Sequence, residues 1–334
     1  MRLHTSLKTN RFLNYKTIFS IIISALGIWL GFRDFDFREF ADAFLSVNLW
    51  YFFASMFVVL FTVYLRAWRW KYLVMPIKKI TVWQLFKMEM IGYFGNNVFP
   101  LKMGEVLRAY TLGKNENIPS TAAFGTIVNE RLLDTLVFAF FIGLGVILFP
   151  DFPEGIRKAG IAGIAILVIF TIVILVINTQ KNFVTTLWQK FNEKFNDKKL
   201  FHNLVNLVEG LTTLFKTPHI RLITIQSLII WLITIAQYWL LGMCLGISFS
   251  LSQVVLIFIA TSIAFAVPAA PGYVGTYHLA AINILVFLGV ALTEAQVLAV
   301  IMHAVGYLSM TSIGLVYFLK FHISVKDVED VELN

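Results

Sequence analysis

Four polar residues lie deep inside an apolar segment, where side chains of this kind are costly. Asn129, Glu130, Arg131 and Asp134 follow the start of a helix predicted over 121–149; the distance is about ten residues, or about 15 Å at 1.5 Å per residue. That depth is close to the middle of a bilayer. Charged groups there cost at least about 2.5–3.5 kcal/mol each unless they pair or face a cavity. The segment indicates an intramembrane binding site or, alternatively, a structural ion cluster that holds helices together.

A second polar group follows an apolar run that is interrupted by glycine and asparagine. Lys102, Gly104, Glu105, Arg108 and Tyr110 lie just after this run. Arginine can hold a phosphate through two parallel N–H bonds, so this group is a candidate for binding a lipid phosphate. A basic flank at the membrane surface explains the same residues under the positive-inside rule.

A third group, rich in proline and glycine, lies late in the chain. Glycine lets the backbone approach a ligand closely, and hydroxyl and imidazole groups could bind a polar headgroup, although a tight turn explains these residues equally well. The group consists of Pro268, Pro271, Gly272, Gly275, Thr276, Tyr277 and His278. Taken together, the predicted substrate-binding residues are Asn97, Gly104, Glu105, Arg108, Glu130, Arg131, Asp134, Gly272, Gly275, Thr276 and His278.

The sequence contains no pattern for a metal, a cofactor or a catalytic nucleophile. Two isolated histidines, His278 and His303, do not specify a metal site. The single cysteine, Cys244, excludes an intrachain disulfide framework and a C-x-x-C motif. A P-loop is absent, which argues against direct use of ATP. We therefore predict a protein that needs no cofactor and is not an enzyme.

The composition places the chain in a membrane. Hydrophobic residues make up 58% and charged residues 14% of the 334 residues, with a mean hydropathy of +0.78, whereas soluble domains carry about 25% charged residues. Apolar runs extend from end to end, which predicts one all-α, polytopic transmembrane domain over 1–334. The net charge of +8 indicates cytoplasmic loops that face anionic headgroups, and no nucleic-acid partner is expected.

The apolar runs predict about six spans and two broken, re-entrant hairpins. The first span would cover 17–32 and be followed by a net acidic loop, and the second would cover 49–65 and end at Arg66, Arg69 and Lys71. The remaining predicted elements are spans at 121–149, 159–177, 223–245 and 297–319 and hairpins at 80–99 and at 251–267 with 279–290.

Each half of the chain has the order span, span, hairpin, span, which predicts an inverted repeat of 17–149 and 159–319. The basic loops would lie on the cytoplasmic side with both termini. They include 178–221, where amphipathic helices are predicted to rest on the membrane surface. A weak sequence similarity between the two halves supports the repeat, because three pairs of residues match at the same separation along the chain: Phe99 with Val267, Pro100 with Pro268 and Gly104 with Gly272.

Three motifs resemble those of the lysylphosphatidylglycerol synthase transmembrane family and its flippase-like relatives. They are Phe99-Pro-Leu-Lys-Met-Gly-Glu-Val-Leu-Arg108, Val128-Asn-Glu-Arg-Leu-Leu-Asp134 and Pro268-Ala-Ala-Pro-Gly-Tyr-Val-Gly275. The resemblance covers nearly the whole chain and implies a protein of the cytoplasmic membrane of bacteria or archaea. It also implies that this protein flips an aminoacylated, glycosylated or polyprenyl-phosphate lipid. The residues that match the family's polar motifs are Gly104, Glu105, Arg108, Glu130 and Arg131.

Two departures from the family pattern limit this expectation. Full-length synthases carry a soluble transferase domain after the membrane region, whereas only a short tail follows Leu319, and Tyr273 and Tyr277 stand where smaller or acidic residues are usual. We therefore predict a lipid flippase or transporter whose partner is a lipid with an anionic or polar headgroup. The alternatives are a lipid-modifying enzyme and a scaffold that docks a membrane enzyme through 178–221. A homo-oligomer or a lipid-synthesis partner enzyme is compatible with the sequence.

Overall fold

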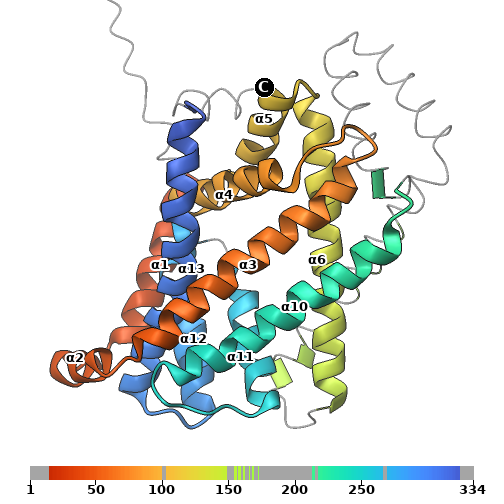
Figure 1. Ribbon diagram of the computed structural model, residues 1–334. Helices are drawn as coiled ribbons and strands as arrows, with labels where there is room; N and C mark the ends of the chain where they lie inside the picture. Colours follow the sequence, from red (N-terminus) through yellow and green to blue (C-terminus); the bar gives the residue numbers. More distant parts are fainter. Residues whose placement is uncertain are drawn as a thin grey trace, which may run out of the picture.

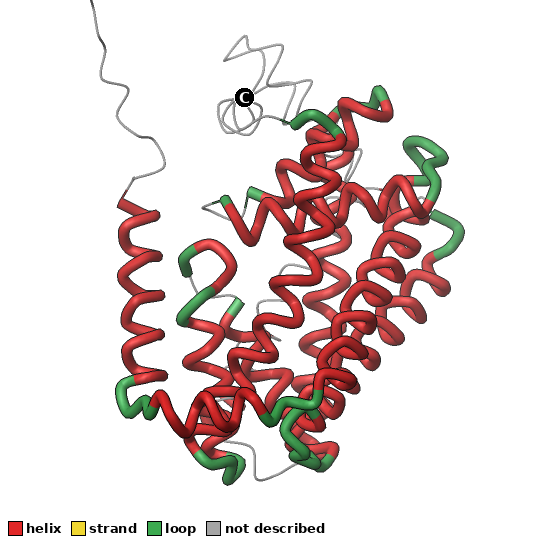
Figure 2. The backbone as a smooth tube through the Cα atoms, turned by 60° about the vertical axis from the view of Figure 1, so that its left-hand side comes forward, coloured by secondary structure: helices red, strands yellow, loops and turns green. Residues whose placement is uncertain are grey.

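Every regular element that the structure describes is a helix, and no strand occurs in these residues (Figure 1, Figure 2). The structure is a computed structural model, which describes residues 15–99, 103–148, 217–265 and 269–323 and isolated positions between 154 and 214. The all-α prediction is confirmed. The elements are α1 (Tyr15–Phe32), α2 (Phe37–Leu45), α3 (Leu49–Val74), α4 (Val82–Val98), α5 (Gly104–Glu116), α6 (Ser120–Leu148), α10 (Ile220–Met243), α11 (Leu251–Ala264), the 3-10 helix η2 (Pro271–Tyr273), α12 (Thr276–Phe287) and α13 (Leu292–Lys320).

Three of these helices, α3, α10 and α13, are long and apolar enough to cross a membrane. Helices α1 and α2 meet at a bend of 87° and form a fourth candidate span only if they are taken together; in Figure 2, α2 lies across the end of the upright α1. The predicted six spans, two re-entrant hairpins and inverted repeat stay predictions. Most of the predicted span at 159–177 and of the loop at 178–221 lies outside the described residues, as do Pro100, Lys102 and Pro268.

The helix that contains the predicted second span is longer than the apolar run at 49–65. Helix α3 continues past residue 65 to Val74 and carries Arg66 and Arg69 inside the protein. The side chain of Arg69 is fully buried. An arginine can remain inside a membrane helix when a carboxylate pairs with it, and α6 supplies that carboxylate.

The acidic segment after α1 was also expected to be a loop, and it contains helix α2. Its N-cap is Asp36, whose carboxylate accepts hydrogen bonds from the backbone N–H groups of Arg38 and Glu39 at 2.8 and 3.0 Å. Such a cap satisfies amide groups that otherwise lack a partner in the first turn. A short acidic segment can therefore form a helix without burying any of its side chains.

The long helices enclose two pairs of shorter ones. Helices α3 and α10 run side by side (Figure 1), and α13 packs against α3, α4 and α12. One pair is α4 with α5, and the other is α11 with α12, joined through η2. Two apolar clusters fill the interior, one mainly around α11 to α13 and the other around α3 to α5.

Two glycines allow the close contacts that these short helices need. At Gly104, a Cβ atom would overlap the carbonyl oxygen of Gly92 and the side chain of Asn96; the Gly104 N–H instead donates to Asn96 Oδ1 at 2.8 Å. At Gly275, φ is +96° and a Cβ atom would overlap the backbone of Ser24 in α1. The N-terminal ends of α5 and α12 therefore pack directly against the backbone of α4 and α1, respectively.

Replacing Gly275 by alanine is expected to lower the free energy of unfolding by about 1–3 kcal/mol through overpacking against α1, with left-handed strain added to this loss. Gly246→Ala is the matched control, because Gly246 also has a positive φ, +70°, but has no atom within 4 Å of the added Cβ. Thermal unfolding in detergent measures both variants. Equal losses would show that backbone strain alone matters and that α1 is not packed on this glycine.

Candidate functional site

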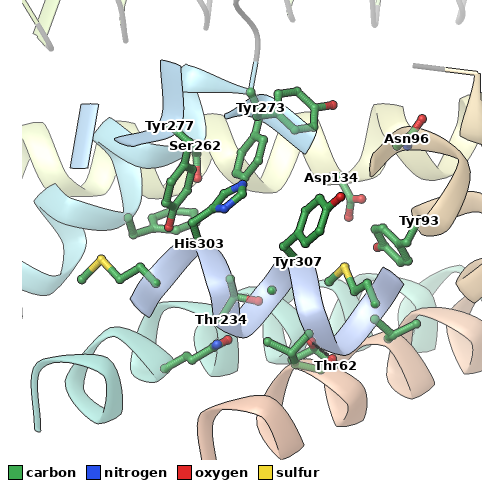
Figure 3. A pocket seen from close by; sticks show the side chains of 18 of the residues that line it. Thr62, Tyr93, Asn96, Asp134, Thr234, Ser262, Tyr273, Tyr277, His303 and Tyr307 are labelled. Atoms are coloured by element: carbon green, nitrogen blue, oxygen red, sulfur yellow. Dashed lines mark hydrogen bonds between the residues drawn. The ribbon is translucent and has the colours of Figure 1, made fainter. Parts of the chain in front are cut away.

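A cavity of about 460 Å³ lies between α3 to α6 on one side and α10 to α13 on the other (Figure 3). Its volume is within the range of about 300–1,000 Å³ that is usual for ligand pockets. Members of both apolar clusters line it, but so do many polar side chains. The polar lining residues are Thr62, Arg66, Tyr93, Asn96, Asn97, Glu105, Arg131, Asp134, Thr135, Thr234, Gln237, Tyr238, Ser262, Tyr273, Tyr277, His303 and Tyr307.

Asp134 is the carboxylate of the charged network that faces this cavity. Its Oδ2 accepts from Arg66 Nη1 at 2.7 Å, and its Oδ1 accepts from Arg69 Nη1 at 2.8 Å and from Trp231 Nε1 at 3.3 Å. Arg69 Nη1 also donates to Ser227 Oγ at 3.0 Å. The contacts join α3, α6 and α10, so this carboxylate fixes two long helices to the helix that carries it.

Glu130, one turn earlier on α6, is fully buried and binds a different set of arginines. Arg108 approaches it in bidentate fashion, with Nη2 at 2.8 Å from Oε2 and Nη1 at 3.3 Å from Oε1. Arg131 Nη2 lies 2.6 Å from Glu130 Oε1, and Arg69 Nη2 lies 3.8 Å from the same oxygen. Glu130 therefore compensates buried positive charge contributed by α3, α5 and α6.

The far side of Arg108 is covered by α4 and α3. Its Nη2 lies 2.6 Å from Glu89 Oε1, and its guanidinium carbon is 3.5 Å from the centre of the Trp70 ring, a cation–π arrangement. The Trp70 indole N–H donates to Thr126 Oγ1 at 2.9 Å. These contacts hold Arg108 away from the cavity, whose lining does not include it.

The network has one more positive than negative charge. Its members are Arg66, Arg69, Arg108 and Arg131 against Glu89, Glu130 and Asp134, four cations and three carboxylates. Arg131 differs from the other arginines because its side chain is 41% exposed. It lines the cavity, and its Nε has no hydrogen-bond partner among the described residues. An anion that enters the cavity would find its binding charge there.

The structure brings together some of the residues predicted from the sequence and separates others. Asn97, Glu105, Arg131, Asp134 and Gly272 line the cavity. Arg108 and Glu130 lie behind them in the ion network, and Gly104 and Gly275 serve close packing. Thr276 and His278 lie at the start of α12, outside the lining; Thr276 Oγ1 donates to the Tyr273 carbonyl oxygen at 3.3 Å, and Gly275 N–H donates to His278 Nδ1 at 3.4 Å.

Several lining residues escaped the sequence analysis. Arg66 was taken for the flank of a span, and Glu89, which belongs to the ion network but not to the lining, was not among the predicted residues. Gln237 and Tyr307 are polar residues within the largely apolar helices α10 and α13 and belong to no motif. These residues could have been found from the sequence, because a charge or an amide inside an apolar helix is costly to bury and is therefore a candidate for a functional role.

The arrangement is suited to binding by fixed charge. In the described part of the chain no three side chains of the types His, Cys, Asp and Glu are grouped so that they could hold a metal ion. Each carboxylate of the network is paired with at least one arginine. Glu105 differs, since it lines the cavity and forms no ion pair with a described residue.

Comparisons with known proteins agree with the helical membrane architecture. A family model described as "Lysylphosphatidylglycerol synthase TM region" matches residues 17–314. A UPF0104 membrane protein of Methanothermobacter thermautotrophicus is 22% identical over 310 residues, covering 89% of this chain and 90% of that protein. A second protein of that name and organism is 24% identical over 260 residues, covering 73% and 77%. One from Methanocaldococcus jannaschii is 25% identical over 230 residues, covering 67% and 93%. No solved structure matches the chain.

Proposed function

The chain belongs to the lysylphosphatidylglycerol synthase TM region family, and from this membership and the cavity we propose that it is a lipid flippase or lipid transporter of the cytoplasmic membrane. Its ligand is a lipid whose anionic or polar headgroup enters the cavity while the acyl chains stay in the bilayer. The observation that carries the proposal is the half-exposed Arg131 beside an otherwise buried ion network, in a cavity enclosed by membrane-length helices.

The charges and the exposure of the network support a binding role. A buried charge cluster that served only to join helices would gain most from balanced, fully paired charges. Here the ion pairs of the described residues join four arginines to three carboxylates, and Arg131 is the arginine whose side chain is most exposed to the cavity, which Arg66 and the unpaired Glu105 also line. A lipid phosphate at Arg131 would balance that excess, and the surrounding pairs Arg66–Asp134 and Arg108–Glu130 would hold Arg131 and its neighbours in position.

Arg131→Gln is expected to abolish specific lipid retention without unfolding the protein, because Arg131 is the most exposed member of the network. The measurement is mass spectrometry of lipids that purify with the wild type and with the variant, after melting curves show that both are folded. Arg38→Gln, on the exposed helix α2, is the matched control and is expected to retain the wild-type lipids. Translocation of the retained lipid class in reconstituted vesicles then tests transport.

One outcome would overturn the proposal. If bulk lipid accompanies the wild type and both variants alike, the cavity does not select a lipid. If one lipid class is enriched on the wild type and on Arg38→Gln and is lost from Arg131→Gln, that class is the ligand.

A further inference from the structure

The two halves of the chain line the cavity with different chemistry. All four of its charged lining residues, Arg66, Glu105, Arg131 and Asp134, come from α3, α5 and α6. Helices α10 to α13 and η2 contribute no Asp, Glu, Lys or Arg to the lining. Figure 3 shows the division, with Tyr307 between Asp134 and Tyr93 on one side and His303, Tyr277 and Ser262 on the other.

The uncharged side presents hydrogen-bonding groups that no described residue satisfies. Tyr238 and Thr261 pair with each other at 2.6 Å, and a ring nitrogen of His303 lies 2.7 Å from the Gly272 carbonyl oxygen. The Gln237 amide and the Tyr307 hydroxyl, in contrast, have no hydrogen-bond partner among the described residues. Gln237 is only 9% exposed. Both groups line the cavity, so a ligand or water that enters it can take up their hydrogen bonds.

Amide and phenol groups can each donate and accept a hydrogen bond, and so can the hydroxyls of a sugar or polyol. The Tyr277 and Tyr307 rings add apolar faces with a polar tip, which suits a ring that is apolar on its faces and hydroxylated at its edge. We infer that the α10 to α13 side of the cavity binds an uncharged, polyhydroxylated headgroup carried on the phosphate that Arg131 binds. This inference rests on the proposed function and specifies its substrate class.

The same lining disfavours an amine-bearing headgroup. A cationic group removed from water requires a carboxylate partner, and the α10 to α13 side offers none in the described lining. Asp134 is already bound by Arg66 and Arg69. Glu105 has no ion pair among the described residues, but it lies with Arg131 on the charged side, so an amine that bound it would not occupy the α10 to α13 side. A sugar or polyol ring can bind on the uncharged side without leaving a charge unpaired.

Three lipids with identical acyl chains test the inference on the purified full-length protein in nanodiscs. Phosphatidylinositol carries a polyhydroxylated ring, phosphatidylethanol has the same phosphodiester without hydroxyls, and phosphatidylethanolamine adds an amine. Native mass spectrometry is expected to show wild-type protein binding phosphatidylinositol about tenfold or more tightly than the other two. Gln237→Leu and Tyr307→Phe should each weaken phosphatidylinositol binding by about threefold to tenfold, the effect of one lost hydrogen bond, and leave phosphatidylethanol binding unchanged.

Gln226→Leu is the matched control, because Gln226 lies on the same helix and is 6% exposed, but does not line the cavity. Equal binding of phosphatidylinositol and phosphatidylethanol, or tightest binding of phosphatidylethanolamine, would overturn the inference. If Arg131→Gln still abolished all binding in that case, the proposed function would stand. If no lipid bound selectively and Arg131→Gln had no effect, both would fail.

Discussion

Glu130→Gln is expected to lower the free energy of unfolding by about 3–5 kcal/mol, the usual cost of removing one partner from a buried ion pair. The substitution leaves Arg108 with Glu89 as its remaining carboxylate and deprives Arg131 of its 2.6 Å contact. It also raises the excess charge of the network from one to two, in a place that water does not reach: Glu130 itself is fully buried. Thermal unfolding in detergent measures the loss.

Glu105→Gln is the control for this experiment, since it removes a carboxylate from the cavity beside the network without breaking an ion pair among the described residues. Its effect is expected to be within about 0.5 kcal/mol, as for substitutions away from such networks. In the double variant Glu130→Gln with Arg108→Met, the losses should be less than additive by about 0.5–3 kcal/mol, because the two groups contact each other. Additive losses would mean that the bidentate pair contributes nothing to stability.

Asp134→Asn is expected to destabilise the protein by a similar amount, about 3–5 kcal/mol, for a different geometric reason. Asp134 is the only carboxylate that Arg66 contacts in the described residues, and it is the nearest one to Arg69. Asparagine keeps the shape and one acceptor oxygen but removes the charge that holds α3 on α6. The expected readout is a lower melting temperature and weaker accumulation in the membrane.

Two further variants test whether the stability lost in Asp134→Asn comes from the uncompensated charge of the arginines. Asp42→Asn, in the exposed helix α2, should be nearly neutral. Adding Arg66→Met to Asp134→Asn restores the original net charge of the network and should recover part of the lost stability. If Asp134→Asn melts like the wild type, the arginines of α3 reach water or other anions, and the network is not the structural link between these helices.

Features that depend on local composition could be predicted from the sequence. The all-α fold followed from the mean hydropathy and the long apolar runs, because a chain in lipid must satisfy its backbone hydrogen bonds within helices or a closed barrel. The polar segment of α6 was recognised for a similar reason, since charges at that depth are rare and expensive. Its carboxylates Glu130 and Asp134 are indeed the centres of the ion network.

Features that depend on distant partners could not be predicted in this way. Arg66 was expected to end a span, because an unpaired arginine is excluded from lipid; its partner Asp134 is 68 positions away in the sequence. Thr276 and His278, in the second predicted hairpin, resembled binding groups, but the turn at Gly275 directs them to local contacts. Gln237 and Tyr307 gave no pattern, although they face the cavity.

The sequence by itself determined that this protein is a helical membrane protein with charged residues inside apolar segments, because hydrophobicity and the cost of buried charge act residue by residue. The tertiary structure alone decided which charges are paired and which face the cavity. In that structure, Arg131 is the member of the ion network that is most exposed to the cavity, and helices α10 to α13 line the opposite side of the cavity without charged residues. Pairing in a medium of low polarity depends on distances of a few ångströms between helices, and those distances exist only once the helices have packed.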